Sequence, residues 1–350
     1  MKSIENSEPN LFGLKREIRT LGFFHATASK KTKKNTIEKL RNNQGIWCSN
    51  HSKIDALIIE YFQNLFSSGG CICEPVLACV EARITPLHNQ LLLEPFTTLD
   101  VKEALFSMHL DKSPGQDGMN PAFYQKFWHV VGKDITEACR SYITNRAFPE
   151  KFNDTLIVLI PKHMHLEHLT DMHPIALCNV LYKIIAKMLV NRMKLVLGEV
   201  ISDSQSAFVL GRAITDNILI STEIIHYLKR NKQGKTGTAE LKIDMSKAYD
   251  RVEWNFLKLM MLRMGFNEDW VEIVIMCVST VSYKVIRNGI EVGPIVPSRG
   301  LRQGDPLSPY LFIIRAEGLS SLIHNRERAR FIHGVKEARS ASCNIPFIFC

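Results

Sequence analysis

The stretch LKIDMSKAYDRVEW, residues 241–254, decides how the rest of the chain is interpreted. It begins with a short apolar run, Leu241-Lys242-Ile243, that ends at Asp244. We expect a strand over residues 239–244 that presents the Asp244 carboxylate at its tip, where a hard divalent cation finds its preferred oxygen ligands. Asp is also common at strand ends as a turn former, and this feature alone favours an ordinary turn over a metal site.

A second informative stretch follows at residues 300–313, GLRQGDPLSPYLFI. Gly304 allows the backbone to approach a ligand closely, and Arg299 and Arg302 have the charge to meet phosphates. We expect a helix here with Asp305 as its N-cap and Pro306 in its first turn, which would leave free N–H groups beside the glycine. A well-capped helix after a flexible loop explains the same residues without any ligand.

The segments around these two stretches predict an α+β fold in which helices pack on a small sheet. Asn288-Gly289 is a strong signal for a hairpin between residues 281–287 and 290–296. The β-branched run at 155–160 predicts another strand. Apolar residues at helical spacing predict the helices, which we place at residues 14–43, 52–66, 121–147, 179–197 and 213–230, with two more beginning at 98 and near 254.

Residues 71–95 show no regular pattern, and we place a domain boundary near residue 95. This divides the chain into a helical basic extension, 1–95, and a larger unit, 96–350. Charged residues make up 23% of the 350 residues and apolar residues 45%, which excludes a largely disordered chain. No apolar run has membrane-spanning length, residues 1–10 are polar and lack the apolar region of a signal peptide, and the nine scattered cysteines indicate reduced intracellular thiols.

The positive charge is concentrated near the N-terminus. The chain has a net charge of +9, and residues 1–43 alone hold ten Lys or Arg against four Asp or Glu. The densest cluster, Lys30, Lys31, Lys33 and Lys34, is a candidate surface for the phosphate backbone of a nucleic acid. A solvated helix face is the competing interpretation, and composition alone favours it.

Taken together, these stretches resemble the reverse transcriptases of LINE-type (non-LTR) retrotransposons, especially those of plants. Residues 241–254 look like the first catalytic motif of that family, and residues 300–313 look like its second palm motif. Further stretches in the same order resemble its fingers motifs: SPGQDGMNPAFYQKFW at 113–128, LIPK at 159–162, HPIALCNV at 173–180 and SQSAFVLGRAITD at 204–216. The resemblance covers nearly the whole chain.

The resemblance implies a right-hand polymerase with fingers and palm that uses an RNA template, a DNA primer and deoxynucleotides. It implies two divalent cations, Mg²⁺ or Mn²⁺, with Asp244 as the first metal-binding aspartate. Tyr249 matches the residue that excludes a ribose 2′-hydroxyl. Gln303 and Gly304 match residues beside the incoming nucleotide, and Lys162 is a candidate contact to its triphosphate. We expect an intracellular protein, nuclear if it is functional, without a membrane partner and with its oligomeric state open.

Several departures from the family pattern bear on the activity. The family continues with a hairpin that carries Ala-Asp-Asp, and no such sequence follows Asp305. The thumb is also missing, and His173 and Arg315 replace the usual Arg and a usually small or apolar residue. We therefore expect a decayed, truncated copy without polymerase activity of its own. A non-catalytic nucleic-acid-binding remnant and an open reading frame with no selected role remain alternatives, whereas Tyr249 argues against an RNA-dependent RNA polymerase.

Overall fold

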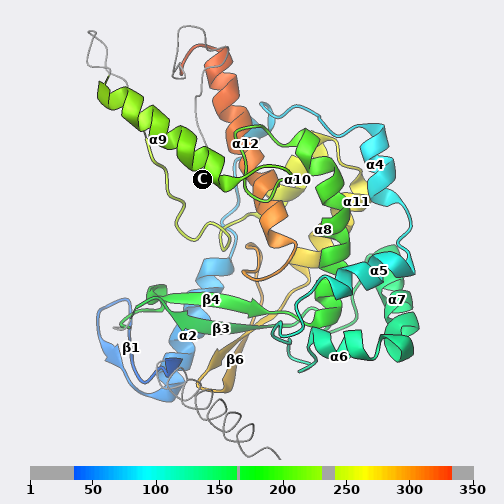
Figure 1. Cartoon of the computed structure of the whole chain (residues 1–350). Helices are drawn as coiled ribbons and strands as arrows, with labels where there is room; N and C mark the ends of the chain where they lie inside the picture. The colour runs from blue at the N-terminus through cyan, green and yellow to red at the C-terminus, as the bar shows by residue number, and fades with distance from the viewer. Residues whose placement is uncertain (1–34, 164–165, 231–240, 333–350) are drawn as a thin grey trace, which may run out of the picture.

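The structure is a computed structural model that describes residues 35–163, 166–230 and 241–332. It is mixed α/β, with a four-stranded sheet on one side and a group of helices on the other (Figure 1). The helices are α2 (His51–Phe66), α3 (Glu74–Leu77), α4 (Pro86–Leu93), α5 (Thr98–Phe106), α6 (Pro121–Lys126), α7 (Trp128–Asn145), α8 (Val180–Val200), α9 (Ile214–Arg230), α10 (Trp254–Met264), α11 (Glu268–Ser279) and α12 (Ser308–Arg328).

The sheet has the strand order β4-β3-β5-β6. Its strands are β3 (Thr155–Pro161), β4 (Met172–Leu177), β5 (Tyr283–Arg287) and β6 (Ile290–Ile295). The central pair, β3 and β5, is parallel, and each outer strand is antiparallel to its neighbour. Asn288 and Gly289 both have positive φ at the β5–β6 turn, which confirms the predicted hairpin.

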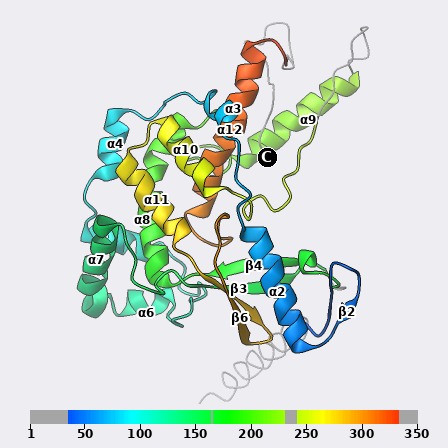
Figure 2. The same ribbon diagram turned by 180° about the vertical axis from the view of Figure 1, so that it is seen from behind.

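Helix α2 covers one face of this sheet (Figure 2). Its buried side chains include Ile54, Ile58 and Phe62, spaced at one helical turn, and they share an apolar core with strand residues such as Ile157 and Val285. A small hairpin, β1 (Leu40–Arg41) and β2 (Trp47–Cys48), precedes α2. The apolar core that this sheet covers therefore includes residues upstream of the predicted boundary at residue 95, although all four strands come from residues 155–295.

The helical side is organised around α8, which packs against α4, α5 and α7. Fourteen of its residues are buried, which explains why its apolar pattern was readable from the sequence. α10 packs against both α11 and α12 and completes this second core. α9 leaves the helical group in both views (Figures 1 and 2).

Three predicted elements are wrong in the described residues. The basic helix predicted to reach residue 43 gives way to β1, because the Asn42 side chain accepts hydrogen bonds from the backbone N–H groups of Gln44 and Ile46 and closes a tight turn. The helix predicted over 121–147 is divided at Phe127 into α6 and α7. The stretch at 71–95, expected to be irregular, contains α3 and α4, and Thr85 begins α4 with a capping box.

The strand predicted over 239–244 is also wrong where the structure describes it, from residue 241 onward. Residues 241–245 have no regular structure, and Leu241 and Ile243 are 81% and 66% exposed. A strand needs a neighbour to receive its backbone hydrogen bonds. Among the described residues, no strand pairs with this segment, so its apolar alternation alone does not produce one.

Candidate functional site

A cleft of about 480 Å³ lies where β1 and α2 face the loops that follow β3 and residue 245. Five cationic side chains and one carboxylate, Glu60, line it. The cations come from distant parts of the chain and are Arg41, Lys162, Lys247, Arg251 and Arg299. Such a concentration of positive charge in a concave site attracts anions, and phosphates above all.

Lys162 stands at the end of β3, directly after Pro161. Its backbone N–H donates to the carbonyl of Asp171 at 2.9 Å, and its exposed ammonium donates to the carbonyl of Thr170 at 2.8 Å. These contacts hold the stem of the side chain at the cleft wall. The ammonium has donors left for a ligand, because a lysine carries three.

Asp244 lies in the irregular segment 241–245 and is exposed. It is therefore neither at a strand tip, as predicted, nor in a helix. The sulfur of the next residue, Met245, contacts the guanidinium of Arg315 in α12. The distance between Nη1 and the sulfur is 3.2 Å. Burial lowers the pKa of Arg315, and no described carboxylate forms an ion pair with it. The predicted interior charge at position 315 is thus half-buried beside the Asp244 segment.

Lys247, which lines the cleft, forms an ion pair with Asp250, with 3.9 Å between Nζ and Oδ2. Burial raises the pKa of the Asp250 carboxyl, while the nearby cations Lys247 and Arg251 oppose that shift. Burial also lowers the pKa of Lys247. Each charge is therefore partly desolvated and depends on the other.

Tyr249 is half-buried, and its ring stacks on Phe312 of α12. The ring centroids are 5.0 Å apart and the planes are inclined by 11°, an offset-stacked pair in an orientation that aromatic side chains favour. Burial raises the pKa of its hydroxyl. The stacking fixes the ring in one orientation, as a steric role would require.

Gln303 and Gly304 form an exposed turn beside β4. The carbonyl of Gln303 accepts a hydrogen bond from the backbone N–H of Ala176 at 2.9 Å. Gly304 has a φ of +108°, and a Cβ at this position would meet the Ala176 carbonyl oxygen at 3.2 Å. Gln303 and Asp250 border the same small hollow, so these parts of the two motifs lie close together.

Arg302 does not have the phosphate-binding role that the sequence suggested, and Asp305 has a second role in the core. Both are buried and form an ion pair at 2.9 Å, and the Asp305 carboxylate also accepts from the Tyr182 hydroxyl at 2.6 Å. The Arg302 guanidinium donates further hydrogen bonds to Asn153 and to the Cys277 carbonyl. Arg302 is therefore not available to phosphates. α12 begins only at Ser308, later than predicted, although one Asp305 carboxylate oxygen still accepts the backbone N–H of Leu307 at 2.8 Å just before the helix.

The two motifs are joined by backbone hydrogen bonds. The N–H of Gly300 donates to the carbonyl of Val252 at 2.8 Å, and that of Leu301 donates to the carbonyl of Tyr249 at 2.9 Å. The indole N–H of Trp254 donates to the carbonyl of Gly300 at 2.7 Å. Gly300 has a φ of +100°, a region that side-chain-bearing residues rarely adopt.

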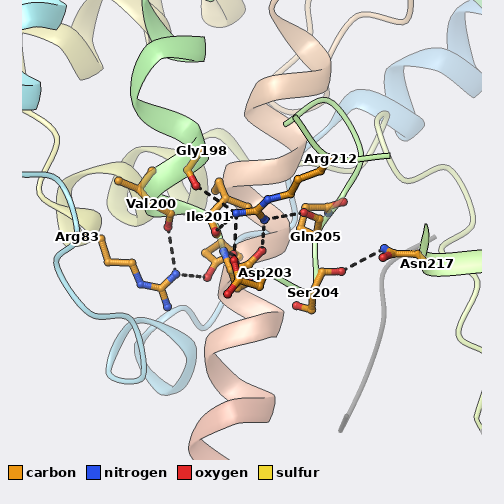
Figure 3. A network of polar contacts seen from close by, with 11 residues as sticks. Arg83, Gly198, Val200, Ile201, Asp203, Ser204, Gln205, Arg212 and Asn217 are labelled. Atoms are coloured by element: carbon orange, nitrogen blue, oxygen red, sulfur yellow. Dashed lines mark hydrogen bonds and ion pairs between the residues drawn. The ribbon is translucent and has the colours of Figure 1, made fainter. Parts of the chain in front are cut away.

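Arg212 is a residue whose position the sequence reasoning did not anticipate. Its guanidinium donates to the carbonyls of Gly198, Ile201, Ser202 and Gln205 and forms an ion pair with Asp203 (Figure 3). The amide of Asn217 in α9 donates to the Ser204 carbonyl at 3.2 Å in the same network (Figure 3). Arg212 thereby satisfies free carbonyls at the end of α8 and fixes the loop that leads to α9.

The described residues do not by themselves fit a site for two divalent cations. Among residues 35–163, 166–230 and 241–332, no group of three or more His, Cys, Asp or Glu side chains is placed to hold a metal ion. Asp244 offers one exposed carboxylate, and the Asp250 carboxylate lies against Lys247. The predicted nucleic-acid-binding cluster Lys30, Lys31, Lys33 and Lys34 lies outside the described residues, and its role stays a prediction.

Comparisons with known proteins place this site in a family. Residues 160–336, just over half of the 350, match the reverse transcriptase (RNA-dependent DNA polymerase) family. The match includes Lys162, Asp244, Tyr249, Gln303 and Gly304. The chain belongs to the reverse transcriptase family.

Three relatives agree with this assignment and with the predicted LINE-type resemblance. The Transposon TX1 uncharacterized 149 kDa protein of Xenopus laevis is 29% identical over 311 residues, covering 87% of this chain and 23% of the relative. A Retrovirus-related Pol polyprotein from type-1 retrotransposable element R2 of Nasonia vitripennis is 26% identical, over 57% of this chain and 18% of the relative. The Probable RNA-directed DNA polymerase from transposon BS of Drosophila melanogaster is 24% identical, over 66% and 25%.

These alignments confirm a reverse transcriptase domain of the non-LTR retrotransposon type. The chain spans about a quarter or less of the length of these three relatives. In the part of the chain that the structure describes, no helix combines the length and apolarity needed to cross a membrane.

Proposed function

We propose that this chain is the template- and nucleotide-binding part of an RNA-directed DNA polymerase, with fingers and palm arranged as in right-hand polymerases. The observation that carries the proposal is the match of residues 160–336 to the reverse transcriptase family. The basic cleft supports it, because Lys162 of one motif and Ser246, Lys247 and Arg251 of another line the same cavity. The ligands would be an RNA template, a DNA primer and deoxynucleotides.

Each of the motif residues has a role in this proposal. Lys162 would bind the triphosphate of the nucleotide at the cleft wall. Tyr249, held against Phe312, would exclude a ribose 2′-hydroxyl and so favour deoxynucleotides. The exposed turn at Gln303 and Gly304 would lie beside the incoming nucleotide and the template, since a glycine there keeps the backbone accessible.

The reaction itself needs more than the described residues supply. Divalent cations, Mg²⁺ or Mn²⁺, stabilise the charge that develops on a transferring phosphate when they are bound. Asp244 would contribute one oxygen ligand, and one carboxylate does not hold two cations against their mutual repulsion. We therefore propose that the 350-residue chain alone binds nucleic acid and nucleotide without extending a primer.

Primer extension on an RNA template tests this proposal. The purified chain, with Mg²⁺ or Mn²⁺ and the four deoxynucleotides, should give no more extended product than Asp244→Ala measured in parallel. A labelled template–primer should nevertheless bind to both proteins, with an affinity that falls as salt rises. Extension by the unmodified chain that disappears in Asp244→Ala would show that a further carboxylate completes the site. Absence of any template–primer binding would refute the function proposed here.

A further inference from the structure

The β1–β2 hairpin carries an exposed aromatic ring between cations. Arg41 and Trp47 are directly opposite each other in the pairing of the two strands. The Arg41 guanidinium carbon lies 4.8 Å and the Lys39 ammonium 4.4 Å from the centroid of the indole ring. Trp47 is 39% exposed and the neighbouring Ile46 58% exposed. A large apolar ring that remains accessible beside two positive charges is typical of sites that stack unpaired bases.

This hairpin is fixed to the body of the molecule. Leu40 and Ile37 are buried in the core beneath the sheet. The amide of Asn288, at the tip of the β5–β6 hairpin, binds both backbone groups of Ile37, accepting from its N–H at 2.9 Å and donating to its carbonyl at 3.0 Å. The Asn42 side chain rigidifies the hairpin turn. Trp47 therefore has a defined position relative to the cleft.

Arg41 connects the hairpin to the cleft. Its side chain also lines the cavity that contains Lys162, Lys247 and Arg251. Its Nε is buried and has no hydrogen-bond acceptor among the described residues, although the Glu167 carboxylate lies 3.3 Å away. Arg41 is therefore ion-paired with Glu167, and its guanidinium joins the ring of Trp47 to the cleft that holds the further cations Lys162, Lys247 and Arg251.

We propose that the β1–β2 hairpin binds an unpaired stretch of nucleic acid, with one base stacked on Trp47 and the adjoining phosphates on Lys39, Arg41 and the cleft. The inference rests on the proposed function and extends it to residues upstream of the matched segment 160–336. A duplex is a poorer fit, because its base faces are already stacked on each other. An acidic peptide would meet the cations but has no ring to place on the indole.

Fluorescence anisotropy with a labelled single-stranded RNA of about 12 nucleotides tests this inference. Trp47→Ala should raise Kd about tenfold or more, since stacking of one base contributes that much. It should leave the slope of log K against log salt unchanged. Arg41→Gln should instead reduce that slope by about 0.7, the value for one phosphate contact on a single strand. Trp47→Phe, which keeps an aromatic ring, should recover part of the affinity.

Two variants serve as matched controls. Phe331→Ala removes another exposed aromatic residue beside a cation, the Arg326 guanidinium at 5.4 Å, beyond the end of α12. Lys133→Gln removes one exposed charge from α7. Both should bind the RNA within about twofold of the unmodified chain. A 12-base-pair duplex of the same sequence should bind to Trp47→Ala and to the unmodified chain with similar affinity.

The outcomes separate this inference from the proposed function. Salt-dependent RNA binding that is equal in the unmodified chain, Trp47→Ala and Arg41→Gln would overturn the role of the hairpin and leave the proposed function standing. Equal losses in Trp47→Ala and Phe331→Ala would also overturn it. A failure of the unmodified chain to bind any nucleic acid would remove both. Unchanged circular dichroism and thermal midpoints of the variants exclude loss of folding as the cause.

Discussion

Residues 241–250 and residues 300–309 carry the two most recognisable motifs of the sequence, yet their surroundings differ. The first segment is exposed from Leu241 to Asp244 and becomes buried only at Asp250. The second is anchored by the buried pair Arg302 and Asp305, and its accessible part is the short turn at 303–304. Motif residues of one family thus have two physical roles: some remain available to a ligand, and others hold the core that positions them.

The largest effect that would test this comparison is expected from Arg302→Met. The substitution leaves the Asp305 carboxylate buried without its cation and leaves Asn153 and the Cys277 carbonyl without their donor. We expect a loss of about 3–5 kcal/mol in the free energy of unfolding, measured by urea denaturation. Asp244→Ala, an exposed carboxylate in the other motif, should change it by about 0.5 kcal/mol or less.

The double variant Arg302→Met/Asp305→Asn should recover part of that loss, because no unpaired charge then remains in the core. An equal loss of unfolding free energy in Arg302→Met and Asp244→Ala would contradict the distinction between a buried, anchored segment and an exposed one.

An intermediate effect is expected from Gly300→Ala, at the junction of the two segments. The new Cβ would meet the carbonyl oxygen of Asp250 at 2.9 Å, and the φ of +100° is strained for alanine. We expect a loss of about 1–3 kcal/mol by the same denaturation measurement. Gly198→Ala is the matched control. Gly198 lies within α8, and the Cβ added there would have open space around it, with nothing found within 4 Å. That variant should gain about 0.5–1 kcal/mol, and equal effects at both glycines would contradict the tight junction.

The smallest effect concerns the pH dependence contributed by Asp250. Burial raises the pKa of this carboxyl above its usual 3.8. Its contribution to stability is therefore fully present below the unfolded-state pKa and is lost as the pH rises through the folded-state pKa. Asp250→Asn removes this loss. In urea denaturation, the free energy of unfolding of the variant minus that of the unmodified chain should therefore increase from about pH 4 to about pH 7. A variant less stable than the unmodified chain at neutral pH would show that the ion pair with Lys247 outweighs burial.

Much of the fold was predictable where local patterns and tertiary packing agree. The β5–β6 hairpin follows from Asn288-Gly289, whose positive φ values suit the turn. α8 follows from an apolar pattern that is buried along nearly its whole length. The pattern was incomplete where tertiary contacts add to it, as at Asp305, whose carboxylate accepts the Leu307 N–H as the pattern suggests but also binds Arg302 and the distant Tyr182 in the core.

The candidate site divides in the same way. The motifs identified Lys162, Asp244, Tyr249, Gln303 and Gly304 as residues of interest, and the family match includes all of them. No sequence pattern indicated that Arg41 shares a cleft with these motifs or that Trp47 lies against Arg41. Their position results from the packing of α2 and the hairpin on the sheet, which joins residues more than a hundred positions apart.

The sequence by itself determined the family, the order of the motifs and the main helices and hairpin, because these depend on residue identity, spacing and turn chemistry. Only the tertiary structure decided which charged residues remain accessible. Arg302 and Arg41 are equally charged in the sequence, and both form ion pairs, but Arg302 is buried in the core while Arg41 lines a cleft with its side chain 36% exposed. Burial and ion pairing depend on neighbours brought together by folding, and local sequence does not specify those neighbours.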